Sequence, residues 1–130
     1  MGRKARSGNG ICGVLPVDKP AGMTSHDVVD RVRGLLGIRR IGHTGTLDPA
    51  AEGLLLLMVG SATRFARYLE GMSKTYRAVI RLGRVTDTLD EEGETVAEFD
   101  GDLDAAVTGG RLEDVLDGFT AGLDKTFKTG

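Results

Sequence analysis

The sequence feature that most constrains the fold is a continuous apolar run, GLLLLMVG, at positions 53–60. Six apolar side chains in a row, without polar alternation, are typical of a strand that is covered on both faces. A glycine at each end marks the limits of the run. It is far shorter than the roughly 18 apolar residues of a membrane span. We therefore expect a strand over 53–59 that is buried on both faces.

A helix is predicted ahead of this strand. Thr24 or Ser25 can cap its start, and Asp27 follows three residues after Thr24, as in a capping box. The helix is expected to stop at Gly37. Apolar residues recur at helical spacing between these limits, at Val28, Val29, Val32, Leu35 and Leu36.

The remaining segments predict the architecture. Positions 11–17 indicate a short buried strand, and Ser61 can cap a short helix. KTYRAVIRLG at 74–83 alternates with a period of two and predicts a strand, and 95–99 predicts another after a turn. An amphipathic helix is expected around 112–119. This order of elements predicts an α+β fold, with a mixed, largely antiparallel β-sheet flanked by helices.

The composition is that of a single globular domain. Of the 130 residues, 40% are hydrophobic and 28% charged, which suits one core but no second complete domain. We expect residues 1–10 to form a flexible, basic N-terminal arm and residues 11–130 to form the folded part. The arm lacks the apolar stretch of a secretory signal, so we expect a cytoplasmic protein with no membrane span.

The single cysteine, Cys12, excludes an internal disulfide. Only His26 and His43 accompany it, and their spacing is not that of zinc ligands. We therefore expect a buried, inert thiol and no metal site. His26 is interpreted as a surface residue near the start of the predicted helix, without a functional role.

The charges are distributed unevenly along the chain. Residues 1–85 carry 14 Lys and Arg against six Asp and Glu, whereas residues 86–130 carry three against 13. A basic segment of this kind attracts phosphate backbones, because each neutralised phosphate releases a counterion. The alternative is a pair of solvated faces that satisfy each other. Charge alone therefore leaves nucleic-acid binding open.

The segment RRIGHTGTLDPAAEG, at 39–53, contains a single aspartate, Asp48, within a glycine-rich bend. Gly42 and Gly45 allow a positive φ, and Pro49 pushes Asp48 toward an extended conformation. We therefore expect the Asp48 carboxylate to be held in one pose.

A carboxylate held in this way has several interpretations. It can form an Asx turn, cap a helix over PAAEG, or pair with Arg39 or Arg40. It can also serve as a nucleophile or base on a rigid loop, with the arginines holding an anionic substrate. The loop by itself leaves these alternatives open.

Three motifs, in order, resemble those of the TruB-type pseudouridine synthases. GVLPVDKPAGMTSHDVVDRVR, at 13–33, resembles the N-terminal motif of this family. RIGHTGTLDPAAEGLL, at 40–55, is similar to its catalytic motif, and KTYRAVIRLGRVTDTLDEEG, at 74–93, resembles its tyrosine motif. The resemblance covers about residues 11–122. It implies the pseudouridine synthase fold and isomerisation of the uridine at position 55 in the TΨC loop of tRNA.

The resemblance implies catalytic roles for two residues. Asp48 falls on the family's catalytic aspartate, which either attacks the ribose of a flipped-out uridine or removes a sugar proton. Tyr76 matches the tyrosine that stacks on the base and helps to remove the C5 proton, although a tyrosine in an alternating strand is also a common core residue. The reaction needs no metal and no cofactor.

RNA-binding roles follow from the same resemblance. His43 matches the histidine that holds the rearranged RNA loop, which offsets the stacking lost on base flipping. Arg39 and Arg40 are expected to contact phosphates. Lys19, with Pro20, is expected to shape the floor near Tyr76. The glycines of the loop, Gly42 and Gly45, let the RNA backbone approach closely.

TruB-type enzymes continue well beyond the motifs found here. Their further strands, the arginine that pairs with the aspartate and a C-terminal PUA domain have no counterpart in the 130 residues. The chain is thus interpreted as the N-terminal part of a catalytic domain, with an incomplete sheet. We expect a monomer whose partner is the tRNA T-arm. Two alternatives stay open: an RNA-binding module without catalysis, and a guide-RNA-dependent enzyme that modifies ribosomal RNA.

Overall fold

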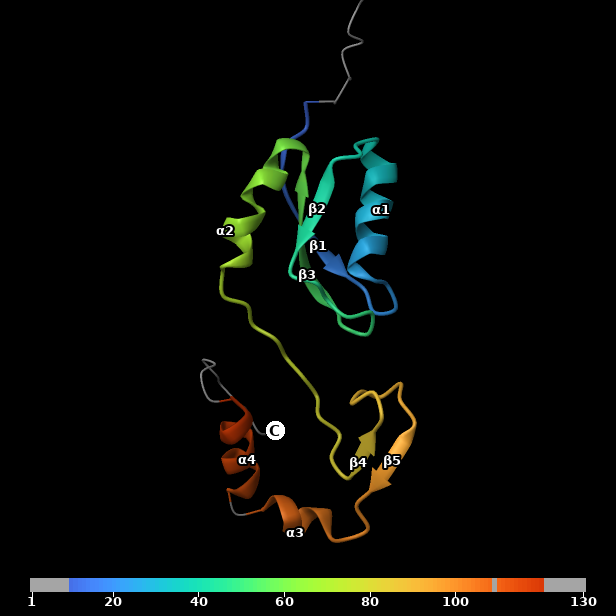
Figure 1. Ribbon diagram of the computed structural model, residues 1–130, viewed down its shortest axis with the longest axis vertical. Coiled ribbons are helices and arrows are strands. Elements are labelled where there is room, and N and C mark those ends of the chain that lie inside the picture. The colour runs from blue at the N-terminus through green and yellow to red at the C-terminus, as the bar shows by residue number, and fades with distance from the viewer. Residues whose placement is uncertain (1–9, 109, 121–130) are drawn as a thin grey trace, which may run out of the picture. The chain divides into compact units, whose positions relative to one another are not determined.

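The computed structural model describes residues 10–108 and 110–120 (Figure 1). The chain divides into two compact units, Met1–Thr75 and Tyr76–Gly130. The predicted N-terminal arm lies outside the described residues except for Gly10, and so does the segment 121–130. The described elements are helices and antiparallel sheets, so the predicted α+β class is confirmed.

A three-stranded antiparallel sheet forms the centre of the first unit. Its strands β1 (Gly13–Lys19), β2 (Ile41–Thr44) and β3 (Gly53–Val59) lie in the order β1-β3-β2. β3 is the strand that the apolar run predicts, and it lies at the centre of the sheet. β1 begins and ends two residues later than predicted, and it tolerates Pro16 because an edge strand can lack one N–H. β2 was not predicted from the sequence, and it pairs with the other edge of β3.

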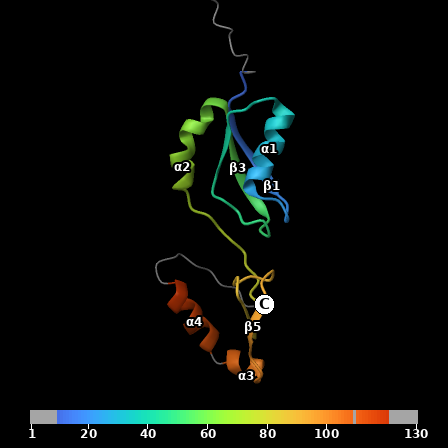
Figure 2. The same ribbon diagram turned by 45° about the vertical axis from the view of Figure 1, so that its right-hand side comes forward.

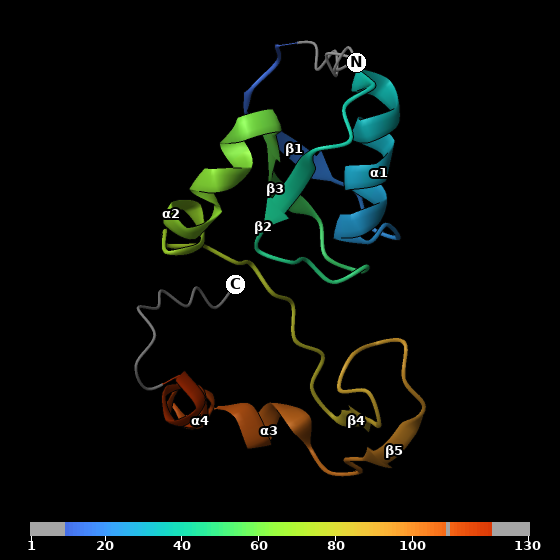
Figure 3. The same cartoon turned by 45° about the horizontal axis from the view of Figure 1, so that its top comes forward.

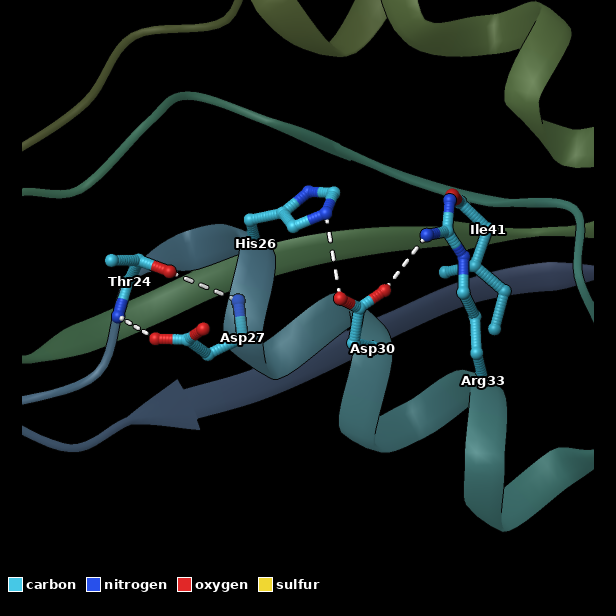
Figure 4. Close-up of polar contacts among 6 residues, drawn as sticks. All are labelled: Thr24, His26, Asp27, Asp30, Arg33 and Ile41. Atoms are coloured by element: carbon cyan, nitrogen blue, oxygen red, sulfur yellow. Dashed lines mark hydrogen bonds and ion pairs between the residues drawn. The ribbon is translucent and has the colours of Figure 1, made fainter.

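Helix α1 (Ser25–Leu36) has the predicted capping box. The Thr24 hydroxyl accepts the Asp27 N–H at 3.0 Å, and the Asp27 carboxylate accepts the Thr24 N–H at 2.9 Å (Figure 4). These bonds satisfy backbone donors that a helix start leaves without partners. The helix ends at Gly37, in the left-handed conformation that glycine adopts readily.

Charged side chains on α1 link the helix to β2 (Figure 4). Asp30 lies 3.4 Å from His26 and 2.9 Å from Arg33. The Arg33 guanidinium also donates to the Ile41 carbonyl at 2.9 Å, on the first residue of β2. His26 therefore belongs to a surface ion-pair network, which agrees with its interpretation as a surface residue.

The core of the first unit lies between α1 and one face of the sheet (Figures 1 and 3). Burial of these apolar side chains removes them from water and is the main force that holds helix and sheet together. The buried members are Val28, Val29, Val32, Ile41, Leu47, Leu55, Leu57 and Val59.

The opposite face of β3 is covered at one end only. The 3₁₀ helix η1 (Gly60–Phe65) and helix α2 (Ala66–Glu70) follow β3, and Met58 and Ala62 are buried there. Leu54, on the same face as Met58, is 65% exposed. The expectation of a strand covered on both faces is thus right near Met58 and wrong near Leu54.

Two expectations about the end of β3 and the start of β1 are wrong. Cys12 is exposed because it lies just before an edge strand, and its Sγ is hydrogen-bonded to the Ser61 Oγ at 2.8 Å. Ser61 does not cap a helix, because Val59 occupies the cap position of η1 and makes no side-chain bond.

The second unit contains a hairpin followed by two helices (Figure 2). Strands β4 (Arg84–Thr86) and β5 (Thr95–Glu98) pair antiparallel, with an irregularity between Val85 and Thr86. Helices α3 (Leu103–Val107) and α4 (Arg111–Thr120) follow. The second strand and the amphipathic helix were predicted, whereas α3 was not.

The predicted strand at 74–83 is wrong, because residues 73–82 form no helix or strand. A strand requires a partner backbone, and no described strand pairs with this segment. Its apolar side chains are exposed, with Val79 at 93% and Ile80 at 62%. Alternation in sequence therefore did not suffice to form a strand here.

No helix within the described ranges combines the length and the apolar character that a bilayer crossing requires.

We expect Thr24→Ala to lower the free energy of unfolding by about 1 kcal/mol, because the Asp27 N–H loses its acceptor. Urea denaturation followed by circular dichroism measures the change. Thr24→Ser keeps the hydroxyl and serves as the control with unchanged stability. Equal stability of Thr24→Ala and the parent would contradict the capping role.

Stability should also depend on the ionisation of Asp27. The backbone N–H of Thr24, and then its hydroxyl, hold the pKa of this carboxyl below its ordinary value of 3.8. The stabilisation is present above pH 3.8 and is lost as the pH falls through the lowered pKa. The stability difference between the parent and Asp27→Ala should therefore shrink in acid, as measured by urea unfolding over a pH series. A difference that grows in acid would refute this assignment.

Candidate active site

Asp48 lies on an exposed turn between β2 and β3. The Asp48 carbonyl accepts the Ala51 N–H at 3.0 Å, which closes a β-turn with Pro49 at its second position. Proline fixes its own φ and restricts the residue before it to extended conformations. The backbone at Asp48 is therefore held locally, as the sequence predicts.

The two glycines of the loop behave differently. Gly45 has a φ of 69°, as expected, and a Cβ there would lie 3.1 Å from the Lys74 Cε. Gly42 does not have the expected positive φ, because it lies inside β2, where the backbone is extended. Of the two glycines, only Gly45 therefore provides a bend with positive φ.

A buried serine holds the residue before Asp48. The Ser25 side chain accepts the Leu47 N–H at 3.0 Å and donates to the Leu47 carbonyl at 3.2 Å. Ser25 is 3% exposed and Leu47 is 9% exposed, so water competes little for these bonds. The first residue of α1 thereby fixes the approach to Asp48.

A buried lysine holds the residue after Asp48. Lys19 is fully buried, and its ammonium donates to the carbonyls of Pro20 at 3.0 Å, Met23 at 2.6 Å and Pro49 at 3.2 Å. The Pro49 carbonyl also accepts the Gly22 N–H at 2.8 Å. The three N–H groups of the ammonium are matched by three carbonyl oxygens, which compensates for the removal of the charge from water.

The Asp48 carboxylate itself is exposed and makes no hydrogen bond or ion pair with any described residue. The structure thus contains no Asx turn, helix cap or pair with Arg39 or Arg40 at this position. Four contacts to its neighbours hold the backbone, while the carboxylate oxygens face solvent. Such a group is able to act as a nucleophile or as a base toward a bound molecule.

The predicted RNA-binding residues of the first unit lie on or beside β2. His43 is partly exposed, and its Nδ1 is buried without a hydrogen-bond partner. Arg39 and Arg40 are exposed just before the strand, and the Arg40 Nε donates to the Thr63 hydroxyl at 2.9 Å. Lys19 is instead enclosed beneath the Asp48 turn.

Tyr76 is the first residue of the second unit and is 66% exposed, in the segment without a strand. Lys19 and the Asp48 turn both belong to the first unit, where Lys19 contacts the turn at the Pro49 carbonyl. Within the described residues, no three His, Cys, Asp or Glu side chains form a group that could hold a metal ion.

Sequence reasoning missed the contributions of Ser25 and Gly22 to the turn. Ser25 was noted only as a possible helix cap, and its actual partner, Leu47, lies 22 residues along the chain. The run KPAGMTS supplied a signal for a bend, but none for what the bend contacts.

The site is thus an exposed aspartate on a turn that an α+β fold holds in place, and comparison with known proteins shows which family has these features. Residues 33–127 match the family model described as TruB family pseudouridylate synthase (N terminal domain). The chain therefore belongs to the TruB family.

Curated relatives agree with this assignment. The chain is 54% identical over 94 residues to a tRNA pseudouridine synthase B of Syntrophotalea carbinolica, covering 72% of this chain and 31% of the relative. It is 46% identical over 107 residues to that of Aquifex aeolicus, covering 82% and 36% respectively. For Yersinia enterocolitica, the identity is 44% over 119 residues, covering 92% and 35%. The chain thus spans about a third of the length of these relatives.

We expect Ser25→Ala to lower the free energy of unfolding by about 1–2 kcal/mol, because the buried Leu47 N–H loses its acceptor. Amide hydrogen exchange at Leu47 should become faster. Ser73→Ala is the matched control, since Ser73 is exposed and such changes usually cost less than about 0.5 kcal/mol. Unchanged exchange at Leu47 in Ser25→Ala would show that the serine does not hold the turn.

Proposed function

We propose that this chain carries the catalytic aspartate of a tRNA pseudouridine synthase, which isomerises the uridine at position 55 of the TΨC loop. The observation that carries the proposal is the exposed, unpaired carboxylate of Asp48 on a turn braced by Ser25 and Lys19. The names of the relatives, tRNA pseudouridine synthase B, support the substrate class.

In the proposed reaction, Asp48 acts on the ribose of a uridine that has left its stack. It either attacks C1′ or removes a proton from the sugar, and the N1–C1′ bond breaks. The uracil turns and rejoins through a C5–C1′ bond, while the Asp48–C1′ bond breaks or, on the second route, the sugar regains its proton. C5 then loses a proton, and N1 gains one. No oxidant or other reactant is consumed. Because the detached base must stay captive, a rigidly held carboxylate is more effective than a mobile one.

The remaining proposed roles concern the RNA. Tyr76 stacks on the uracil and helps to remove the C5 proton. His43, which is partly exposed on β2, holds the opened T-loop. Arg39 and Arg40 contact phosphates. Lys19 is assigned a positioning role, because its three N–H groups are already bound.

The proposal also concerns the state in which the chain works. We place the activity in the cytoplasm, where a tRNA substrate is processed, and expect the protein to act on the T-arm as a monomer.

A second candidate is an RNA-binding module without catalysis. It is favoured by the exposed arginines beside β2, Arg39 and Arg40, which can contact phosphates whether or not a uridine is converted. The two candidates differ in one measurable property, the conversion of uridine.

We expect Asp48→Asn to abolish uridine conversion without weakening RNA binding, since the amide can neither attack nor accept the proton. The assay uses a chimera in which this chain replaces the matching 107 residues of the Aquifex aeolicus relative. Carbodiimide mapping of a T-arm transcript reads conversion, and fluorescence anisotropy reads binding. Asp104→Asn, an exposed carboxylate on α3, is the matched control.

A parental rate in Asp48→Asn would overturn the catalytic assignment. The same assay on the 130-residue chain separates the two candidates. In one outcome, the 130-residue chain binds the transcript and leaves its uridine intact, although the chimera converts it. That result would favour the binding module for the 130-residue chain by itself.

A further inference from the structure

Three residues at the junction of β2 and η1 form a closed ring of hydrogen bonds. The Gly60 N–H donates to the Arg40 carbonyl at 2.8 Å. The Thr63 hydroxyl donates to the Gly60 carbonyl at 3.0 Å, and it accepts the Arg40 Nε–H at 2.9 Å. A hydroxyl has one hydrogen and two lone pairs, so both of its bonds form in a single orientation.

The backbone corner of the ring, Gly60, is a position that admits only glycine. Gly60 has a φ of 65°, and a Cβ there would lie 2.7 Å from the Ile11 carbonyl oxygen. Thr63 is half-buried, and its methyl carbon lies 4.0 Å from the position of a Cβ on Gly42. The hydroxyl that meets Arg40 is held within η1 by its bond to the Gly60 carbonyl.

The ring fixes one edge of an otherwise exposed guanidinium. Only the Nε of Arg40 is bound, and its Nη1 and Nη2 have no partner among the described residues. A guanidinium is planar, so holding Nε sets the plane in which the other two nitrogens point. Paired guanidinium N–H groups match the spacing of phosphate oxygens. Holding the long side chain in advance also reduces the entropy lost on binding.

The position of this guanidinium is favourable for an RNA ligand. Arg40 directly precedes β2, the strand that carries His43 and leads into the Asp48 turn. Arg39 and Arg64, which flank the ring residues in sequence, are exposed and make no ion pair with a described residue. The surface beside the ring is thus basic and free of neighbouring carboxylate partners.

We propose that Thr63 is a positioning residue, which holds the Arg40 guanidinium so that its two terminal nitrogens bind one RNA backbone phosphate. This inference rests on the proposed function, because it needs an RNA ligand. Thr63 itself does not touch the RNA. Its contribution is transmitted entirely through Arg40.

The test measures binding of a T-arm stem-loop transcript to the whole chain by fluorescence anisotropy over a salt series. Thr63→Val should raise the Kd about 3- to 10-fold, and Thr63→Ser should restore it to within about twofold of the parent. Arg40→Gln should raise the Kd and reduce the slope of log Kd against log salt by about one. In the Arg40→Gln background, Thr63→Val should change the Kd by less than about twofold.

The controls are matched in chemistry. Thr88→Val removes a hydroxyl that donates to Asp90 in the second unit, and Arg31→Gln removes an exposed charge from α1. Thr88→Val should not raise the Kd as Thr63→Val does, and Arg31→Gln should not raise it as Arg40→Gln does.

Each other outcome overturns the inference in a distinguishable way. Equal weakening by Thr63→Val in both backgrounds would mean that the threonine acts on stability rather than through Arg40. If Arg40→Gln has the parental Kd and salt slope, Arg40 does not contact a phosphate and the inference fails. The proposed role of Asp48 is unaffected by that result. No binding of the transcript by the parent chain would overturn both this inference and the RNA ligand of the proposed function.

Discussion

The buried ammonium of Lys19 joins three parts of the first unit: the end of β1, the segment that leads into α1, and the turn after Asp48. An ammonium removed from water is costly unless its donors are satisfied, and here three carbonyls satisfy them. A backbone arrangement that left one of these N–H groups without an acceptor would be less stable, so the three carbonyls are held at the ammonium. The turn that carries Asp48 therefore follows the geometry of β1 and α1 rather than moving independently.

At Asp48, the backbone is held by neighbouring side chains, whereas the carboxylate is not. Ser25 and Lys19 bind the main chain on either side of Asp48, and neither contacts its carboxylate. The structure thus fixes the backbone on both sides of Asp48 and leaves its carboxylate without a partner among the described residues. A structural aspartate would show the opposite pattern, with bonded oxygens.

The Arg40 ring provides a similar arrangement at the other end of β2. In both places, a side chain from a neighbouring element makes the bond, and the Asp48 carboxylate and the terminal nitrogens of Arg40 keep no partner among the described residues. The sheet joins the Arg40 ring to the Asp48 turn through β2. β2 pairs with β3 from Ile41 to Thr44, so Arg40 and the Asp48 turn flank one rigid strand.

The sequence by itself determined the features whose causes are local. The Thr24–Asp27 capping box and the valine spacing predicted α1, the apolar run predicted β3, and Pro49 predicted a restrained Asp48. Only the tertiary structure decided which distant groups meet: Ser25 with Leu47, Lys19 with Pro49, and Arg40 with Thr63. It also decided that 74–83 forms no strand, although its alternation is local. Strands and long-range hydrogen bonds need a partner brought near by the whole fold, and no local pattern specifies that partner.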